Sequence, residues 1–432
     1  MNQADTAWML IATALVLLMT PALAFFYGGL VRSKNSLNTM MMSFISLGFV
    51  GVLWALLGYS LAFSTGNNWI GDLSNAFLRG VGLEVRTATT IPHALFMSYQ
   101  GTFAIITAAL ISGAIVERMR FSAYVAFISL WALAVYSPIA HWVWGGGWLS
   151  KMGALDFAGG TVVHINAGVA GLALAIFLGS RRGWPGQPMR PHNVPFVLLG
   201  AGLLWFGWFG FNAGSALGAN QLAGYAFVNT NTATAAALLA WIGVEKLRDG
   251  KATTLGAASG AVAGLVAITP CAGFVSPLGS IAVGAIAGGG CALAVALKGM
   301  VRIDDSLDVV AVHLVGGILG SLCVGLFATV DTNPAGADGL FYGGGWGLLG
   351  KQALAVVSVI AYTFVVTTII AFVVNRVITM RVPAEVEDEG LDYALHGETA
   401  YEFSTLGGSP SYGAQPMSSS VRTPADREGV TT

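Results

Sequence analysis

Residues 156–180 read DFAGGTVVHINAGVAGLALAIFLGS, and residues 305–330 read DSLDVVAVHLVGGILGSLCVGLFATV. Each stretch is apolar and long enough to cross a hydrocarbon core as a helix, which takes about 20 residues. In each, an aspartate precedes a histidine by eight positions, and glycines follow the histidine at offsets of four and seven. The matched residues are Asp156 and Asp305, His164 and His313, Gly168 and Gly317, and Gly171 and Gly320. The two stretches therefore indicate membrane-spanning helices and an internal duplication.

The composition agrees with a membrane protein. Of the 432 residues, 55% are hydrophobic and 9% charged, against about 25% charged in an average soluble domain. A formal net charge of -1 argues against a nucleic-acid partner. The three cysteines, Cys271, Cys291 and Cys323, lie in apolar runs without the spacing of metal ligands. We expect buried, inert thiols, no bound metal and no cofactor.

Gaps between charged residues predict eleven spans, and hence an all-α polytopic membrane protein. They lie near 7–31, 38–64, 93–116, 121–143, 161–180, 194–216, 223–244, 253–271, 276–297, 307–330 and 350–375. The first lacks a basic region before it, so we interpret it as a span and not as a signal peptide. The eighth and ninth are separated only by a short turn around Pro277.

Lysine and arginine predict the orientation. Alternate connections and the segment after the last span hold 14 of these residues, whereas the opposite connections hold 4: Arg79, Arg86, Lys151 and Lys351. The positive-inside rule then places the N-terminus outside and the C-terminus in the cytoplasm. We expect a transmembrane domain over residues 1–382 and a cytoplasmic tail over 383–432 that is disordered towards its end, while residues 390–398 are varied enough to dock.

A repeat of five spans reverses the direction of equivalent helices, because five is odd. We expect inverted repeats over about 7–180 and 194–330, followed by a last helix over about 350–378. Many transporters share this plan, which brings equivalent residues together near the middle of the membrane. His164 and His313 would then meet and line a transport pathway, since ionisable side chains in a membrane usually face a pathway or a partner. Structural hydrogen bonding between helices and a metal pair are the alternatives.

The aspartates and aromatic residues leave more than one interpretation open. Asp156 and Asp305 each precede a span and could cap its helix, as could Asp304, while Asp156 could also favour a cation beside it. Trp142, Trp144 and Trp148 are typical of an interfacial aromatic belt, although a cation–π site is the alternative. Phe103, Phe211, Trp205, Trp208 and Phe209 are most simply explained as packing or lipid-facing residues. These features predict a transporter without naming its substrate.

Several segments resemble one family. Asp156-Phe-Ala-Gly-Gly-Thr-Val-Val-His164-Ile-Asn-Ala-Gly168 is similar to the signature of the ammonium transporter (Amt/Mep/Rh) family, and the bacterial Amt branch is the closer one. Residues 24–35, 109–119, 207–215, 304–308 with His313, and 390–398 agree with it in the same order. The resemblance runs from about residue 5 to 403.

The resemblance implies a homotrimer in the cell (plasma or inner) membrane, with one pore per subunit, that takes up ammonium or ammonia. Trp144, Phe103 and Ser215 would form a recruitment site that Asp156 stabilises. Phe103 and Phe211 would form a gate, and His164 and His313 the twin histidines of the pore. In bacterial members a PII signal protein can plug the cytoplasmic face.

The resemblance also suits the physics of the substrate. Ammonium can release a proton and cross an apolar pore as ammonia, whereas potassium must stay charged and hydrated. We expect ammonia and the proton to travel separately, which makes net transport electrogenic. An ammonium sensor and an electroneutral ammonia channel are the alternatives, and no arrangement of residues suggests an enzyme.

Overall fold

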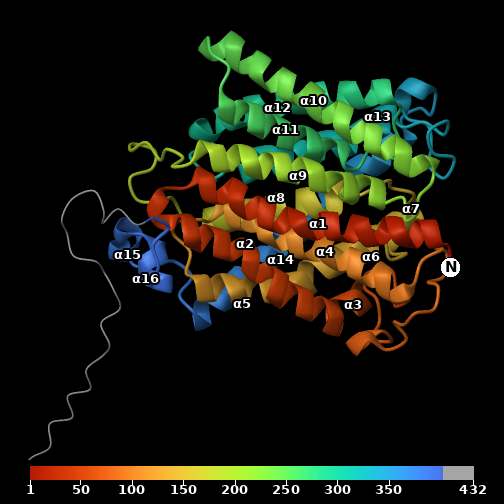
Figure 1. Ribbon diagram of the computed structural model, residues 1–432, viewed down its shortest axis with the longest axis horizontal. Helices are drawn as coiled ribbons and strands as arrows, with labels where there is room; N and C mark the ends of the chain where they lie inside the picture. The colour runs from red at the N-terminus through yellow and green to blue at the C-terminus, as the bar shows by residue number, and fades with distance from the viewer. Residues whose placement is uncertain (402–432) are drawn as a thin grey trace, which may run out of the picture. The chain divides into compact units, whose positions relative to one another are not determined.

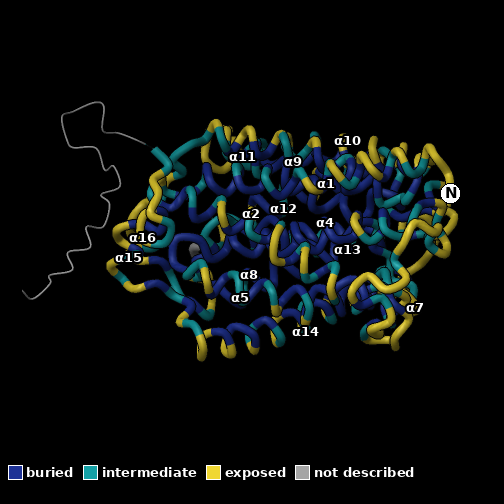
Figure 2. Tube along the Cα trace, turned by 60° about the horizontal axis from the view of Figure 1, so that its bottom comes forward, coloured by how far each residue is buried: buried dark blue, intermediate teal, exposed yellow. Residues whose placement is uncertain are grey.

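The computed structural model describes residues 1–401, and their regular secondary structure is helical. The α-helices are α1 (Gln3–Leu30), α2 (Ser36–Leu53), α3 (Tyr59–Phe63), α4 (His93–Ile111), α5 (Phe121–Trp131), α6 (Ser137–Val143), α7 (Trp148–Met152), α8 (Asn166–Leu178), α9 (Val194–Gly214), α10 (Gln221–Asp249), α11 (Thr254–Ile268), α12 (Pro277–Val301), α13 (Gly316–Phe327), α14 (Gly347–Val377), α15 (Ala384–Glu389) and α16 (Leu391–His396). The long helices run side by side (Figure 1), and the buried residues lie in the middle of this bundle (Figure 2). α1 begins at one end, here called the N-terminal face, and α15 and α16 lie at the other, the tail face.

The helices make an all-α polytopic membrane protein. Within the described residues, ten helical segments are long and apolar enough to cross a membrane. The predicted eighth span corresponds to α11, which has 15 residues. At 1.5 Å per residue α11 is about 22 Å long, short of a hydrocarbon core of about 30 Å. The expected count of eleven is compatible with this arrangement, and the orientation remains a prediction.

In the described part of the chain, four spans contain a π-helical turn, at Trp54–Gly58, Ala132–Tyr136, Gly160–Ile165 and Val310–Val315. Such a turn inserts a residue into an α-helix and re-aims the side chains around it, and it is frequent at functional sites. His164 and His313 each lie inside one of these turns, which lead directly into α8 and α13. The two matched sequence stretches therefore have the same local structure.

The two histidine-bearing segments pack against each other through matched glycines. A Cβ atom on Gly168 would lie 2.5 Å from the backbone nitrogen of Leu314, the residue after His313. A Cβ on Gly317 would lie 2.9 Å from Cγ1 of Ile165, the residue after His164. Each segment thus uses its own glycine to approach the other's histidine turn. This reciprocity is what inverted repeats require, and it supports that prediction.

We expect Gly168→Ala to destabilise the protein, because the added methyl group meets backbone that cannot move away cheaply. Overpacking of this kind costs about 1–3 kcal/mol. Thermal unfolding of the purified protein in detergent measures it. Gly202→Ala is the matched control, since a Cβ at Gly202 in α9 meets no atom within 4 Å. Equal melting of the two variants would contradict the close approach.

The tail face contains a buried network of charges. Glu117 accepts hydrogen bonds from the backbone N–H and the guanidinium of Arg32 and pairs with Arg181 at 3.1 Å. Arg181 also pairs with Asp304 at 2.8 Å, and Arg118 donates to the carbonyl of Asp304. Asp305 caps the following helical turn, because its Oδ2 accepts from the N–H of Val310 at 2.7 Å. Asp304 was expected to cap this helix as well, and that prediction is wrong, because its carboxylate pairs with Arg181.

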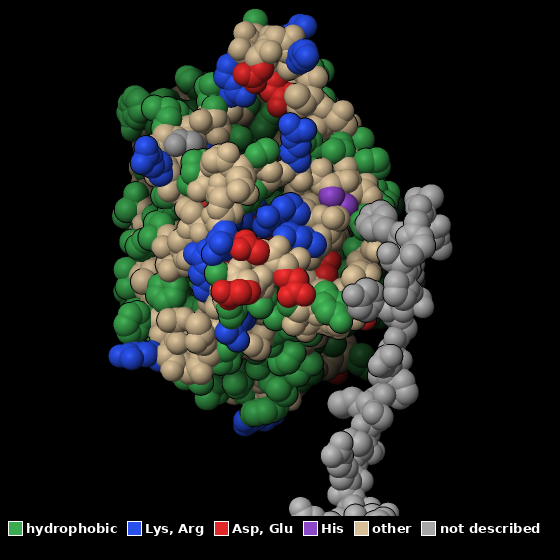
Figure 3. Space-filling view, turned by 90° about the vertical axis from the view of Figure 1, so that its left-hand side faces the viewer, with side chains coloured by type: hydrophobic (Ala, Val, Ile, Leu, Met, Phe, Trp, Pro, Cys, Tyr) green, Lys and Arg blue, Asp and Glu red, His purple; other side chains and the backbone are tan. Residues whose placement is uncertain are grey.

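Residues 384–396 dock on the tail face and overlap the segment 390–398 that was expected to dock. The Asp392 carboxylate accepts the backbone N–H groups of Leu37 and Asn38, at 3.0 and 2.8 Å, and so caps the first turn of α2. Arg182 pairs with Asp388, and Arg381 with Glu387. Figure 3 shows Lys and Arg side chains gathered around Asp and Glu on this face. The predicted disorder towards the end of the tail concerns residues outside the described range.

Candidate functional site

A pocket of about 290 Å³ opens on the N-terminal face, and predicted site residues form its floor. Phe103 comes from α4, Trp144 from the end of α6, and Ser215 from the end of α9. The rings of Phe103 and Trp144 meet edge to face, with centroids 6.0 Å apart. Two aromatic surfaces and one hydroxyl thus face the same space, which suits a small cation.

Two stacked phenylalanines close the bottom of this pocket. The centroids of Phe103 and Phe211 are 4.1 Å apart, and both side chains are buried. Tyr99, which sequence reasoning missed, holds this stack in place: its hydroxyl lies 2.9 Å from the carbonyl of Phe211 and 3.3 Å from the Ser215 hydroxyl. The Ser215 hydroxyl can donate to the same carbonyl at 2.9 Å. The stacked rings thus separate this pocket from the histidines below.

Asp156 holds the wall of the pocket and does not point into it. Its carboxylate accepts the N–H groups of Gly159, Gly160 and Thr161, each at 2.7 Å, and also binds the Thr161 hydroxyl. These donors belong to the start of the histidine-bearing π turn. The Asp156 carbonyl in turn accepts the indole N–H of Trp144 at 2.9 Å. Of the two interpretations of this residue, capping fits its contacts, and it fixes Trp144 as well.

His164 and His313 meet beneath the phenylalanines. Their Nδ1 atoms are 3.2 Å apart, and both side chains are buried. One Nδ1 must carry hydrogen and the other a lone pair, so one ring has a free Nε2 acceptor and the other an Nε2 donor. Within the described residues, Nε2 of His164 has no hydrogen-bond partner. The pair can therefore exchange hydrogen bonds with a small guest at its ends.

Trp208 completes the surroundings of the histidines, although its sequence position suggested only packing. Its ring stacks on His164 with centroids 5.4 Å apart, and its indole N–H donates to the Thr269 hydroxyl at 2.9 Å. Both rings line a constriction of about 10 Å³, which Phe211 and His313 also border. This is about the space of one water molecule. The signal that could have found Trp208 is its place three residues before Phe211 on α9.

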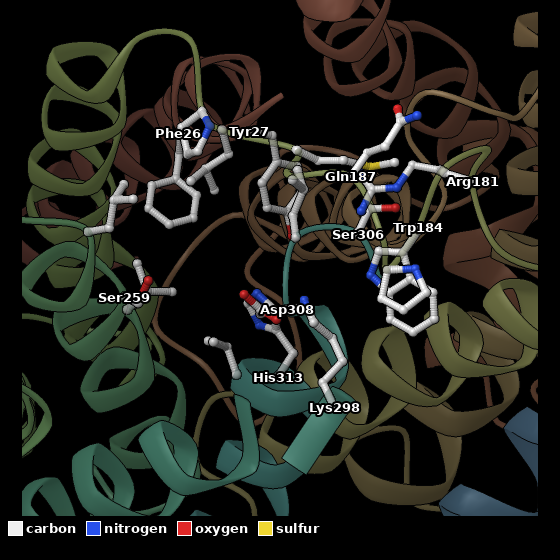
Figure 4. Close-up of a pocket in the computed structure, with 18 residues that line it drawn as sticks. Phe26, Tyr27, Arg181, Trp184, Gln187, Ser259, Lys298, Ser306, Asp308 and His313 are labelled. Atoms are coloured by element: carbon white, nitrogen blue, oxygen red, sulfur yellow. Dashed lines mark hydrogen bonds and ion pairs between the residues drawn. The ribbon is translucent and has the colours of Figure 1, made fainter. Parts of the chain in front are cut away.

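A second cavity, of about 340 Å³, opens from His313 towards the tail face. In Figure 4, His313, Lys298 and Asp308 lie along one side of it and Arg181 and Gln187 along the other. Lys298 pairs with Asp308 at 2.5 Å. These charged side chains make the cavity polar, so it can hold water beside His313.

Similarity to known proteins extends over nearly the whole chain. The model of the Ammonium Transporter Family matches residues 7–401. The chain belongs to the ammonium transporter family. The resemblance carried by the sequence motifs is thereby confirmed at the level of the family.

Relatives and solved structures agree with this membership. The chain is 54% identical to an ammonium transporter of Mycobacterium tuberculosis over 94% of its own length and 91% of that one. It is 53% identical to an ammonium transporter of Bacillus subtilis over 93% and 99%. The crystal structure of Saccharomyces cerevisiae Mep2 superposes with a TM-score of 0.83 at 38% identity, over 89% of this chain and 91% of that one. A structure titled Sensor Amt Protein gives 0.83 at 30% identity, over 91% and 98%.

Membership settles the coarse function and leaves the residue roles to the geometry. A family member with this many apolar helices is a multi-pass membrane protein, and the family name implies ammonium as its substrate. The structure brings Trp144, Phe103, Ser215, Phe211, His164 and His313 into one column between two cavities.

Proposed function

We propose that this chain takes up ammonium across the cell (plasma or inner) membrane by deprotonating it and passing ammonia between twin histidines. Trp144, Phe103 and Ser215 recruit the cation, with Asp156 fixing Trp144, and Phe103 and Phe211 form the gate. The observation that carries the proposal is the column itself. A polar pocket, an aromatic stack, a histidine pair and a second polar cavity follow one another.

The column separates a guest that can lose its charge from one that cannot. A monovalent cation can exchange part of its water for the Trp144 and Phe103 faces and the Ser215 oxygen. The narrow space between Phe211 and the histidines has no room for a hydration shell, so a bare ion pays the full cost of burial there. Ammonia carries no such cost and can exchange a hydrogen bond with the unpartnered Nε2 of His164. The proton passes separately, which makes transport electrogenic.

We further propose a homotrimer with one pore per subunit, its N-terminal face outside. Apolar side chains are exposed along the flanks of several long helices, including Leu10, Phe206 and Phe227, as lipid or neighbouring subunits require. On the cytoplasmic tail face, the charged residues offer a surface that a PII signal protein can recognise. Mass measurement of the purified protein in detergent and a pull-down with a PII protein test these two assemblies.

Purified protein in liposomes on a solid-supported membrane tests the transport proposal. We expect an ammonium pulse to give a current and a potassium pulse to give none. Ammonia entry seen by an internal pH dye without any current would support the electroneutral channel. Silence in both assays would support the sensor, which the Sensor Amt Protein likeness keeps as the second candidate.

We expect Trp144→Leu to raise the ammonium concentration for half-maximal current by about fivefold, because a cation–π contact worth about 1 kcal/mol is lost. Concentration series in the same liposomes measure it. Trp69→Leu is the control, since Trp69 is exposed on the same face and lies outside the pocket lining. An equal change in both variants would remove Trp144 from the recruitment site.

A further inference from the structure

A cationic side chain, Arg86, stands in the wall of the pocket that is proposed to recruit a cation. It belongs to the connection between α3 and α4, where Val85 pairs with Pro92 and the Arg86 N–H donates to the Ile91 carbonyl at 3.1 Å. The guanidinium carbon lies 3.8 Å from the centroid of the Phe96 ring and 5.8 Å from that of Phe63. Backbone pairing and aromatic contacts thus hold the Arg86 guanidinium at one place in the pocket wall.

The charge of Arg86 has no acidic partner in the described part of the chain. Among residues 1–401, no ion pair involves Arg86. The other residues that line the pocket are uncharged, with Gln100 and Ser215 as the polar ones. Asp156 lies outside the lining, and its carboxylate is taken up by backbone donors. A cation entering this pocket therefore meets one fixed positive charge.

We propose that Arg86 is a specificity-determining residue, a fixed charge that keeps multivalent cations out of the recruitment pocket at some cost in ammonium affinity. The inference rests on the proposed function and adds a selection step before the gate. Repulsion by a fixed charge is proportional to the charge of the ion. A divalent cation is therefore disfavoured by the square of the factor that acts on ammonium. Divalent ions cannot deprotonate, so any that entered would block the pathway.

The test compares wild type with Arg86→Gln in liposomes at low ionic strength. We expect the ammonium concentration for half-maximal current to fall about threefold and the Mg²⁺ concentration for half-inhibition to fall about ninefold, its square. Raising the salt from about 10 mM to about 500 mM should shrink both differences, because it shortens the Debye length. A merely structural role for Arg86 would not produce this salt dependence.

Two further variants separate charge from packing. Arg86→Lys keeps the charge and should resemble wild type, whereas Arg79→Gln removes a charge from the same connection outside the pocket lining and should change neither value. Unchanged values in Arg86→Gln, or an Arg86→Lys that behaves like Arg86→Gln, would refute the filter. Tryptophan fluorescence titrations of the purified proteins with ammonium and Mg²⁺ measure the same two ratios without transport. If the wild type binds both ions but passes no ammonium, the proposed function is overturned. The effect of Arg86 on the two binding affinities can still be measured in that case.

Discussion

Replacing His164 and His313 together with alanine is expected to destroy the distinction between ammonium and potassium. The two imidazoles fill the space between the Phe211 ring and the tail-face cavity. Two methyl groups in their place leave room for water, and a hydrated passage no longer forces an ion to lose its proton. We expect the ratio of ammonium to potassium current to fall by more than about tenfold, which corresponds to about 1.4 kcal/mol in relative barrier height. Currents from liposomes with matched protein content measure it.

The control for this variant is His396→Ala. His396 lies in α16 on the tail face, where it interacts with the Asn38 side chain, and it lines neither cavity of the column. It should keep the wild-type current ratio. A double alanine variant with unchanged ammonium current and unchanged potassium exclusion would show that the histidines are structural.

Glu117→Ala is expected to give the largest loss of stability. Its carboxylate is buried and is shared by Arg32, Arg181 and Asn35. Removing one partner of a buried ion pair costs about 3–5 kcal/mol, because the remaining charges stay buried without compensation. Thermal unfolding in detergent should show a clearly lower midpoint for Glu117→Ala. The control, Asp249→Ala, breaks an exposed pair with Arg248 and should leave the midpoint unchanged.

The same network predicts how stability depends on pH. Burial by itself would raise the pKa of Glu117, but Arg181 and Arg32 outweigh it and hold that pKa below its ordinary value of 4.5. The contribution of Glu117 to the free energy of unfolding is thus complete above about pH 4.5. It is lost as the pH falls through the lower pKa that Glu117 has in the folded protein. The wild type should lose stability on acidification in this range, and Glu117→Ala should lose less. Equal acid profiles would contradict a charged Glu117.

The sequence predicted the helical spans and the histidine pair for reasons that do not depend on side-chain packing. Apolar length marks a span whatever surrounds it, and matched spacing around His164 and His313 marked the repeat. The direction of an aromatic side chain has no such signal. Trp208 and Phe209 are neighbours of the same type, yet Trp208 stacks on His164 while Phe209 stacks on Phe227. Tyr99 was missed because its hydroxyl acts on α9, which contacts it only in the folded bundle.

Loop residues were beyond prediction for a different reason. Arg86 lies in a connection without hydrophobic periodicity. The sequence therefore identified it only as one of the positive charges that predict the orientation. Asp304 and Asp305 are adjacent and chemically identical, but one pairs with Arg181 and the other caps Val310. That choice depends on where α8 ends, and this is known only once the helices are packed.

The docking of α16 on α2 bears on how the protein is made. Leu37 emerges from the ribosome 355 residues before Asp392, the residue whose carboxylate receives its N–H. Until then the start of α2 must leave two backbone donors to water. The first hairpin of the bundle is therefore finished by one of the last pieces of the described chain to be synthesised. A chain broken off before residue 392 leaves that turn uncapped and so differs structurally from a chain that contains α16.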